Sequence, residues 1–155
     1  MIKMMIGEKM AREAVKFLRS QKSEEGAVKL LGIKVELDRL ENACETSEYI
    51  NFNYPQFTAH KKDLYVNVLS ISHKDLTPAN AENADTGRIA ENIVSLLNEQ
   101  KKQWGMKIKL LSIKALLPEG TDAEEVSEYI LNKYSEYRVH SKNQGDFPIV
   151  AIGYR

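Results

Sequence analysis

Two histidines occupy matching places in the chain and are the side chains best suited to bind a ligand. His60 and His140 each precede a polar turn, and Tyr54 and Tyr134 stand six residues before them. Neutral imidazole is a common metal ligand and changes its charge near neutral pH. A metal site needs three or four converging ligands, however, and neither histidine has Asp, Glu or His neighbours at metal-ligand spacing. These four residues are therefore candidate ligand-binding residues without a predicted metal or cofactor; alternatively, each histidine simply caps the end of a strand.

The single cysteine, Cys44, is the one thiol that could act as a nucleophile. A nucleophile needs a base beside it, and the matching position later in the chain is Glu124, an ordinary residue for the first turn of a helix. Serine nucleophile motifs, a phosphate-binding glycine loop and a paired-histidine metalloprotease signature are absent from the sequence. We therefore predict no catalytic residues. The sequence favours a protein that is not an enzyme, without deciding the question.

A cluster of lysines surrounds the single tryptophan. The segment KKQWGMKIK, residues 101–109, places four lysines around Trp104, a combination that can stack on a nucleic-acid base. Lysines in the last turn of a helix also favour the negative end of the helix dipole. The chain has 22 Lys and Arg and 22 Asp and Glu, so its formal net charge is zero. We therefore predict no nucleic-acid binding and interpret the segment as the end of a helix.

These residues recur because the chain resembles itself. When the sequence is shifted by 80 positions, residues 43–60 match residues 123–140 at eight of 18 positions, and both segments contain SEYI. The same shift matches residues 28–34 with residues 108–114 at five of seven positions. Two matching blocks that keep their order and their spacing are typical of an internal repeat.

A third block extends the repeat towards the amino terminus. A shift of 79 positions matches residues 11–22 with residues 90–101 at five of 12 positions. Three blocks in the same order predict a tandem duplication with repeats at 7–72 and 87–154. The polar, proline-containing segment 73–86 has no counterpart and is predicted to be the linker.

The repeat also decides the type of an ambiguous element. The segment YINFNY alternates apolar and polar residues like a strand, but its partner carries apolar residues at helical spacing. The partner also begins with Asp122, a good helix N-cap, and Asn42 occupies the same place in the first repeat. We therefore predict helices at 42–54 and 122–136, the first of them ended by Pro55.

The other elements follow from periodicity. In each repeat, apolar residues on one helical face predict a first helix, a long apolar segment predicts a strand, and a short strand, a polar turn and a longer strand close the unit. The helices are expected at 8–21 and 87–102, the long strands at 28–36 and 107–116, and the polar turn of the second repeat at 141–146. Leucine doublets in both long strands interrupt the alternation, which indicates a bulge or burial on both faces.

The fold class expected from these elements is α/β, in the broad sense that includes α+β. A sheet must cover at least one face, so two α-β-α-β-β units are expected to form a two-layer sandwich of four helices on a mixed sheet. A chain of 155 residues with 43% hydrophobic and 28% charged residues has the composition of an ordinary globular protein. We predict a single pseudo-symmetric domain spanning residues 1–155.

The cellular location is only partly readable. The amino terminus lacks the apolar core of a secretory signal, and no segment approaches the roughly 20 apolar residues of a membrane span. As written, the chain is expected to be cytoplasmic; the alternative is a soluble domain of a longer membrane-anchored or secreted parent. The oligomeric state and redox compartment stay open.

Two hypotheses for function follow. The first is a non-catalytic binding or assembly module that contacts a protein partner through an exposed strand edge or the groove where the repeats meet. The alternative is a small-ligand-binding protein or an enzyme with a site at the junction of the two repeats, a usual place for a pocket. The absence of a catalytic constellation favours the first.

Overall fold

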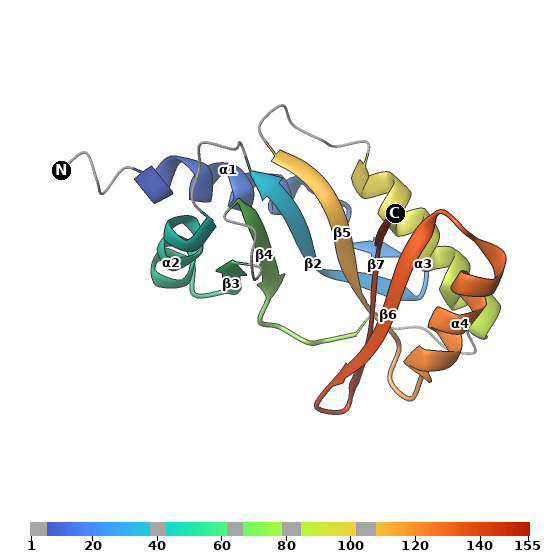
Figure 1. Cartoon of the computed structure of the whole chain (residues 1–155). Coiled ribbons are helices and arrows are strands. Elements are labelled where there is room, and N and C mark those ends of the chain that lie inside the picture. Colours follow the sequence, from blue (N-terminus) through green and yellow to red (C-terminus); the bar gives the residue numbers. More distant parts are fainter. Residues whose placement is uncertain (1–5, 38–42, 62–66, 79–84, 102–107) are drawn as a thin grey trace. The chain divides into compact units, whose positions relative to one another are not determined.

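The computed structural model describes residues 6–37, 43–61, 67–78, 85–101 and 108–155 (Figure 1). Within these ranges the helices are α1 Ile6–Ser20, α2 Ala43–Asn53, α3 Thr86–Lys101 and α4 Ala123–Lys133. The strands are β1 Glu24–Glu25, β2 Val28–Leu37, β3 Phe57–Lys61, β4 Val68–His73, β5 Ile108–Leu116, β6 Tyr137–Gln144 and β7 Phe147–Tyr154. The predicted order of helix, strand, helix, strand and strand therefore occurs twice, with a short β1 that the sequence did not indicate.

Three sequence predictions concern residues outside the described ranges. They are the helix start at Asn42, Trp104 with the adjoining Lys102 and Lys107, and the central part of the linker at 79–84. None of the helices in the described part of the chain is long and apolar enough to cross a membrane.

The chain forms two compact units, and each is assembled from three separate stretches of sequence. Unit 1 consists of Met1–Gln21, Gly32–Asp75 and Gln103–Leu111, and unit 2 consists of Lys22–Leu31, Leu76–Lys102 and Ser112–Arg155. The long strands β2 and β5 thus each contribute one half to unit 1 and the other half to unit 2. Burial is continuous from Leu30 to Ile33 in β2, in agreement with the burial on both faces expected at its leucine doublet.

Unit 1 contains α1 and α2 and the strand order β3, β4, β2, β5. Helix α1 packs against α2, and α2 packs against β3 and β4. The largest fully buried side chains of this unit include Phe57, Ile33, Ile50 and Ile71. In β3 the exposed Thr58 and His60 alternate with the buried Phe57 and Ala59, so the polar side chains of this strand point away from α2.

Unit 2 contains α3 and α4 and the strand order β2, β5, β7, β6, with β1 paired to β2. Helix α3 packs against α4, and α4 packs against β6 and β7. On the other face of this sheet Leu31, Leu116 and Ile149 form an apolar cluster. Leu76, which follows β4 in sequence, packs against that cluster, and Lys29 Nζ donates to the backbone oxygen of Thr77 at 3.0 Å.

The fold is α+β and is consistent with the predicted two-layer sandwich, but the prediction of a mixed sheet is wrong. Every strand pair with a defined register is antiparallel: β1–β2, β2–β4, β3–β4, β5–β7 and β6–β7. The physical reason is the position of the second strand of each hairpin. A helix returns the chain so that β3 could run parallel to β2, but β4 lies between them and pairs with both.

The second helix of each unit is helical as predicted. Asp122 is the N-cap of α4, and its side chain accepts hydrogen bonds from the backbone N–H groups of Glu124 and Glu125. Helices α2 and α4 end in the same way. The N–H of Tyr54 donates to the backbone oxygen of Ile50, and the N–H of Tyr134 donates to the backbone oxygen of Ile130, each at 2.8 Å. Residues 43–60 and 123–140 have the same burial class at every position. Equal packing is what a tandem duplication requires, although the duplication itself stays a prediction.

The polar turn predicted at 141–146 is wrong in its extent. Strand β6 continues to Gln144, and the turn is formed by Gly145 and Asp146 alone. Gly145 has φ 65°, which a residue without Cβ adopts at little cost in a two-residue hairpin. The polar residues that suggested a turn lie at the end of β6, where Lys142, Asn143 and Gln144 are exposed although they alternate between the two faces of the strand.

Candidate functional site

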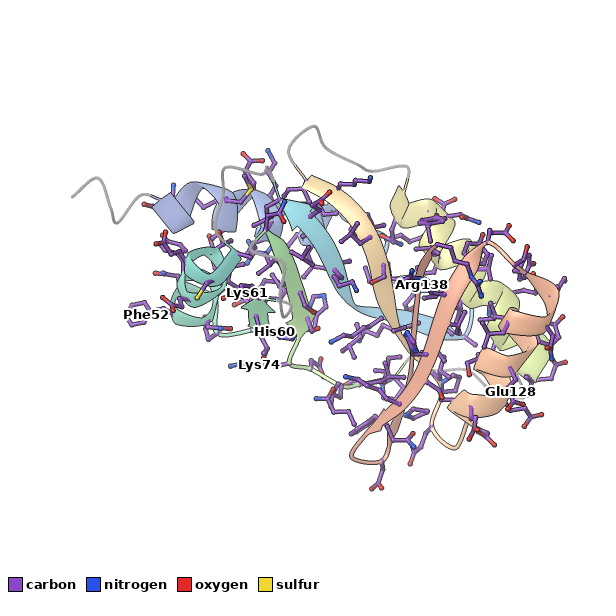
Figure 2. All side chains as sticks on the ribbon, viewed as in Figure 1. Phe52, His60, Lys61, Lys74, Glu128 and Arg138 are labelled. Atoms are coloured by element: carbon purple, nitrogen blue, oxygen red, sulfur yellow. The ribbon has the colours of Figure 1, made fainter. Side chains whose placement is uncertain are left out.

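The two predicted histidines lie on exposed faces of their sheets. His60 in β3 stands opposite Ser70 in β4, and Ser70 stands opposite Lys34 in β2. Neighbouring strands are about 4.8 Å apart, so the Cα atoms of His60 and Lys34 are roughly 10 Å apart across the sheet. Unit 1 therefore carries a row of histidine, serine and lysine on one face of its sheet, with Ser70 buried at the centre of the row. His60 is labelled in Figure 2.

Unit 2 repeats this row with a smaller central residue. His140 in β6 stands opposite Ala151 in β7, and Ala151 stands opposite Lys114 in β5. Alanine carries no hydroxyl group, so a chemical role for the serine of the first row has no counterpart here. What the two rows share is two basic side chains on one sheet face.

The predicted tyrosines lie with the helices, apart from the histidines of their units. The Arg19 guanidinium lies 5.7 Å from the ring centroid of Tyr54 and 5.8 Å from that of Phe57. Phe57 is buried and His60 is exposed, and residues three apart in a strand point to opposite faces. Tyr54 and His60 are therefore not brought together within unit 1. The hypothesis of a ligand site at the junction of the repeats stays a prediction.

Tyr134 joins a polar network in unit 2 that links α4 to α3. Its hydroxyl donates to Oε1 of Glu91 at 2.6 Å, and Lys133 Nζ donates to Oε2 at 2.7 Å. The hydrogen bond from Lys133, and then that from Tyr134, lowers the pKa of Glu91. The hydrogen bond to Glu91 raises the pKa of Tyr134. Both shifts move these groups away from neutral pH, so the network suits a structural tie better than acid–base catalysis.

Cys44 is exposed on α2, and its thiol lies 3.6 Å from Oε1 of Glu48. A reactive thiolate is favoured by a neighbouring cation, and this neighbour is a carboxylate. In the described part of the chain, no group of three or more His, Cys, Asp or Glu side chains could hold a metal ion.

The outer face of unit 2 is basic. Strand β6 carries Arg138, His140 and Lys142 at every second position, all on the side away from the helices, and β5 adds Lys114. Strands β5, β6 and β7 contain no Asp or Glu. Acidic residues of the unit lie in α4, which includes Glu128 (Figure 2), in β1, and at the two ends of β6, where Glu136 precedes the strand and Asp146 stands in the turn after it.

The basic side chains of β6 form a regular array. Residues two apart in a strand are separated by about 6.6–6.8 Å, and carboxylates at alternate positions of another extended chain have the same spacing. Sequence reasoning missed Arg138 and Lys142 because it placed Lys142 in a turn and gave Arg138 no role. The alternation of exposed basic residues with Val139 and Ser141 was the signal that could have identified them.

Comparison of the chain with protein-family models, with curated proteins and with solved structures finds no match.

Proposed function

We propose that the protein is a non-catalytic binding module that contacts an acidic segment of a protein partner through the outer face of β6. The observation that carries this proposal is the row of Arg138, His140 and Lys142 on a sheet face where β5, β6 and β7 contain no acidic residue. Opposite charges on adjacent strands attract, and like charges repel. An extended partner with carboxylates at alternate positions satisfies all three basic side chains at once.

The proposal can be tested with a probe of defined chemistry. We would titrate the protein with a fluorescent eight-residue peptide that alternates Glu and Val, and with a matched peptide that alternates Lys and Val. Binding of the acidic peptide that weakens as salt rises, together with no binding of the basic peptide, is the expected result, because exposed charge pairs are screened by ions. Failure of the acidic peptide to bind at low salt would overturn the proposal.

A charge-reversal pair locates the surface. Arg138→Glu combined with Lys142→Glu should weaken binding of the acidic peptide roughly tenfold or more, since attractive exposed pairs become repulsive. Lys16→Glu combined with Arg88→Glu makes the same change of net charge on exposed positions of α1 and α3 and is the matched control. Equal losses in the two double variants would show that net charge matters and this face does not.

A single-stranded oligonucleotide of equal charge serves as the competing ligand class. Tighter binding of the oligonucleotide than of the acidic peptide, lost in the Arg138→Glu and Lys142→Glu variant, would replace the protein partner by a nucleic acid and overturn the proposal. We expect the peptide to bind more tightly, because Arg138 and Lys142 on a chain of zero formal net charge give a short cationic array.

A further inference from the structure

Each unit ends its sheet with a strand that pairs on one side only. In unit 1 the terminal strand is β3, and in unit 2 it is β6. In an antiparallel pair, residues bonded to the neighbour alternate with residues whose N–H and C=O groups point outward. These outward groups at a terminal strand are free to pair with another chain unless something covers them.

In unit 1 a side chain covers the outward groups. The N–H of Lys74 donates to the backbone oxygen of Gln56 at 3.0 Å, so the alternation directs the N–H and C=O of Ala59 outward. Asn51 from α2 meets both groups: its Nδ2 donates to the oxygen of Ala59 at 2.7 Å, and the N–H of Ala59 donates to its Oδ1 at 2.8 Å. One amide side chain thus takes the place of a neighbouring strand.

In unit 2 the same position lacks that cover. The N–H of Arg155 donates to the backbone oxygen of Glu136 at 3.1 Å, and the alternation then directs the N–H and C=O groups of Val139, Ser141 and Asn143 outward. The residue of α4 that matches Asn51 is Leu131, which has no polar group.

Val139 is the residue that matches Ala59, and its backbone edge is open. In the parts of the chain that the structure describes, no hydrogen bond reaches the N–H or C=O of Val139 from outside the β6–β7 ladder. Arg155 Nε donates to the oxygen of Tyr137 at 3.1 Å, so the covered part of this edge ends two residues before Val139. Between Val139 and Asn143 the edge can accept a strand.

An exposed apolar side chain lies on the helix that packs against this edge. Leu131 of α4 is 43% exposed, and α4 packs against β6. Apart from Leu131, the only large exposed hydrophobic residue in the described ranges is Phe52, which projects from α2 in unit 1 (Figure 2). An extended chain laid along β6 would direct every second side chain to the helix side, where Leu131 offers apolar contact.

We propose that β6 binds its partner by strand addition: an extended acidic segment of another protein pairs with the open backbone between Val139 and Asn143. Its glutamates or aspartates face Arg138, His140 and Lys142 on the outer side, and its apolar side chains face Leu131 on the helix side. This inference rests on the proposed function and adds the binding mode and the sequence pattern of the partner, which alternates acidic and apolar residues.

The charge pattern selects an acidic partner over a second copy of the chain. Pairing of β6 with β6 of another copy would bring the basic residues at 138, 140 and 142 of both strands onto one face. Like charges opposite one another in adjacent strands are destabilising. A strand with carboxylates at alternate positions turns this repulsion into attraction. Charge complementarity therefore favours an acidic segment as the partner of β6.

The decisive variant transfers the cover of unit 1 to unit 2. Leu131→Asn should place an amide over Val139 as Asn51 does over Ala59, while leaving Arg138 and Lys142 in place. We expect binding of the alternating Glu and Val peptide to weaken at least tenfold in this variant. Asn51→Leu makes the reverse exchange in unit 1 and should leave binding at β6 unchanged within about twofold, so it is the matched control.

A second test needs no protein variant. The same peptide with N-methyl groups on every second amide keeps its charge but cannot donate to the edge, and the two N-methylation phases block opposite sides of the peptide. We expect one phase to lose at least tenfold in affinity and the other to bind normally. Amide hydrogen exchange should slow at Val139 and Ser141 when the unmethylated peptide binds, while exchange at Ala59 stays the same.

The outcomes separate this inference from the proposed function. If charge reversal at Arg138 and Lys142 abolishes binding but Leu131→Asn and both methylated peptides bind normally, the surface is correct and strand addition is wrong. If the unmodified acidic peptide fails to bind at all, the proposed function itself is wrong. If the chain instead dimerises and Leu131→Asn abolishes the dimer, the occupant is a second copy and the acidic partner is wrong.

Discussion

The second helix and the short strand after it bury the same positions in units 1 and 2, but the surfaces beside them differ. Ile50 and Ile130 are both fully buried, and burial agrees along the whole of 43–60 and 123–140. At the next residue of each helix, Asn51 covers a strand edge and Leu131 does not. The two units therefore share the packing of this helix and strand. They differ in one surface residue, Asn51 or Leu131, and that residue decides whether the backbone of the terminal strand is covered.

The first prediction concerns the matching buried isoleucine in the core of each unit. Ile50→Ala and Ile130→Ala should each lower the free energy of unfolding by roughly 2–5 kcal/mol, because each removes buried methyl groups and leaves a cavity. Denaturant titration measures both losses. A loss below about 0.5 kcal/mol for either variant would contradict the equal burial of the two isoleucines.

The two units also differ in a glycine–serine pair between neighbouring strands: Gly32 of β2 stands opposite Ser72, the residue before His73 in β4. A Cβ at Gly32 would lie 2.7 Å from the backbone oxygen of Ile71 and would also meet the hydroxyl of Ser72. In unit 2 the order is reversed, with Ser112 opposite Gly153. We expect Gly32→Ser to cost about 1–3 kcal/mol by overpacking, measured by denaturant titration.

Adding Ser72→Gly to that variant copies the arrangement of unit 2 and should restore part of the lost stability. A double variant less stable than Gly32→Ser alone would show that the two sheets do not tolerate this exchange equally.

The edge cover of unit 1 should have a measurable but smaller effect. Asn51→Leu removes two hydrogen bonds to Ala59, whose backbone groups can then bind water, so we expect a loss of about 1 kcal/mol. Amide exchange at Ala59 should accelerate at the same time. Leu131→Asn should slow exchange at Val139. If amide hydrogen exchange at Ala59 and Val139 stays the same in these variants, the two edges do not differ in cover.

The smallest expected effect concerns alkaline pH and belongs to unit 2. Burial raises the pKa of Tyr154 to about 12 from its ordinary value of 10.0, with a smaller contribution from Tyr137. Between these values the folded protein keeps a proton that the unfolded chain releases, so the free energy of unfolding falls as pH rises from 10 to 12. His73 occupies the corresponding place opposite Phe57 in unit 1.

Urea titrations at pH 9, 10 and 11 should show that Tyr154→Phe lessens this alkaline loss of stability. Tyr49→Phe changes a half-buried tyrosine of α2 and is the control. Equal pH dependence in the wild-type protein and in Tyr154→Phe would contradict the assignment to Tyr154.

The sequence predicted the element types well because periodicity reports which face of a helix or strand is buried. It predicted the sheet less well, because the pattern of a strand does not tell which strand lies beside it; β4 between β2 and β3 decides the antiparallel order. The cover of Ala59 by Asn51 joins residues of two different elements, and neither residue is unusual where it stands. Its one trace in the sequence is the mismatch of Asn51 with Leu131 directly after the shared SEYI.

The division of β2 and β5 between the two units has a consequence for biosynthesis. Unit 1 takes in the first half of β5, so its sheet cannot be completed until the ribosome has passed the second long strand. Contacts between residues that are far apart in the sequence form late, so folding is slow and strand edges stay exposed until they form. We therefore expect the nascent unit 1 to depend on chaperones until Leu111 has left the ribosomal exit tunnel.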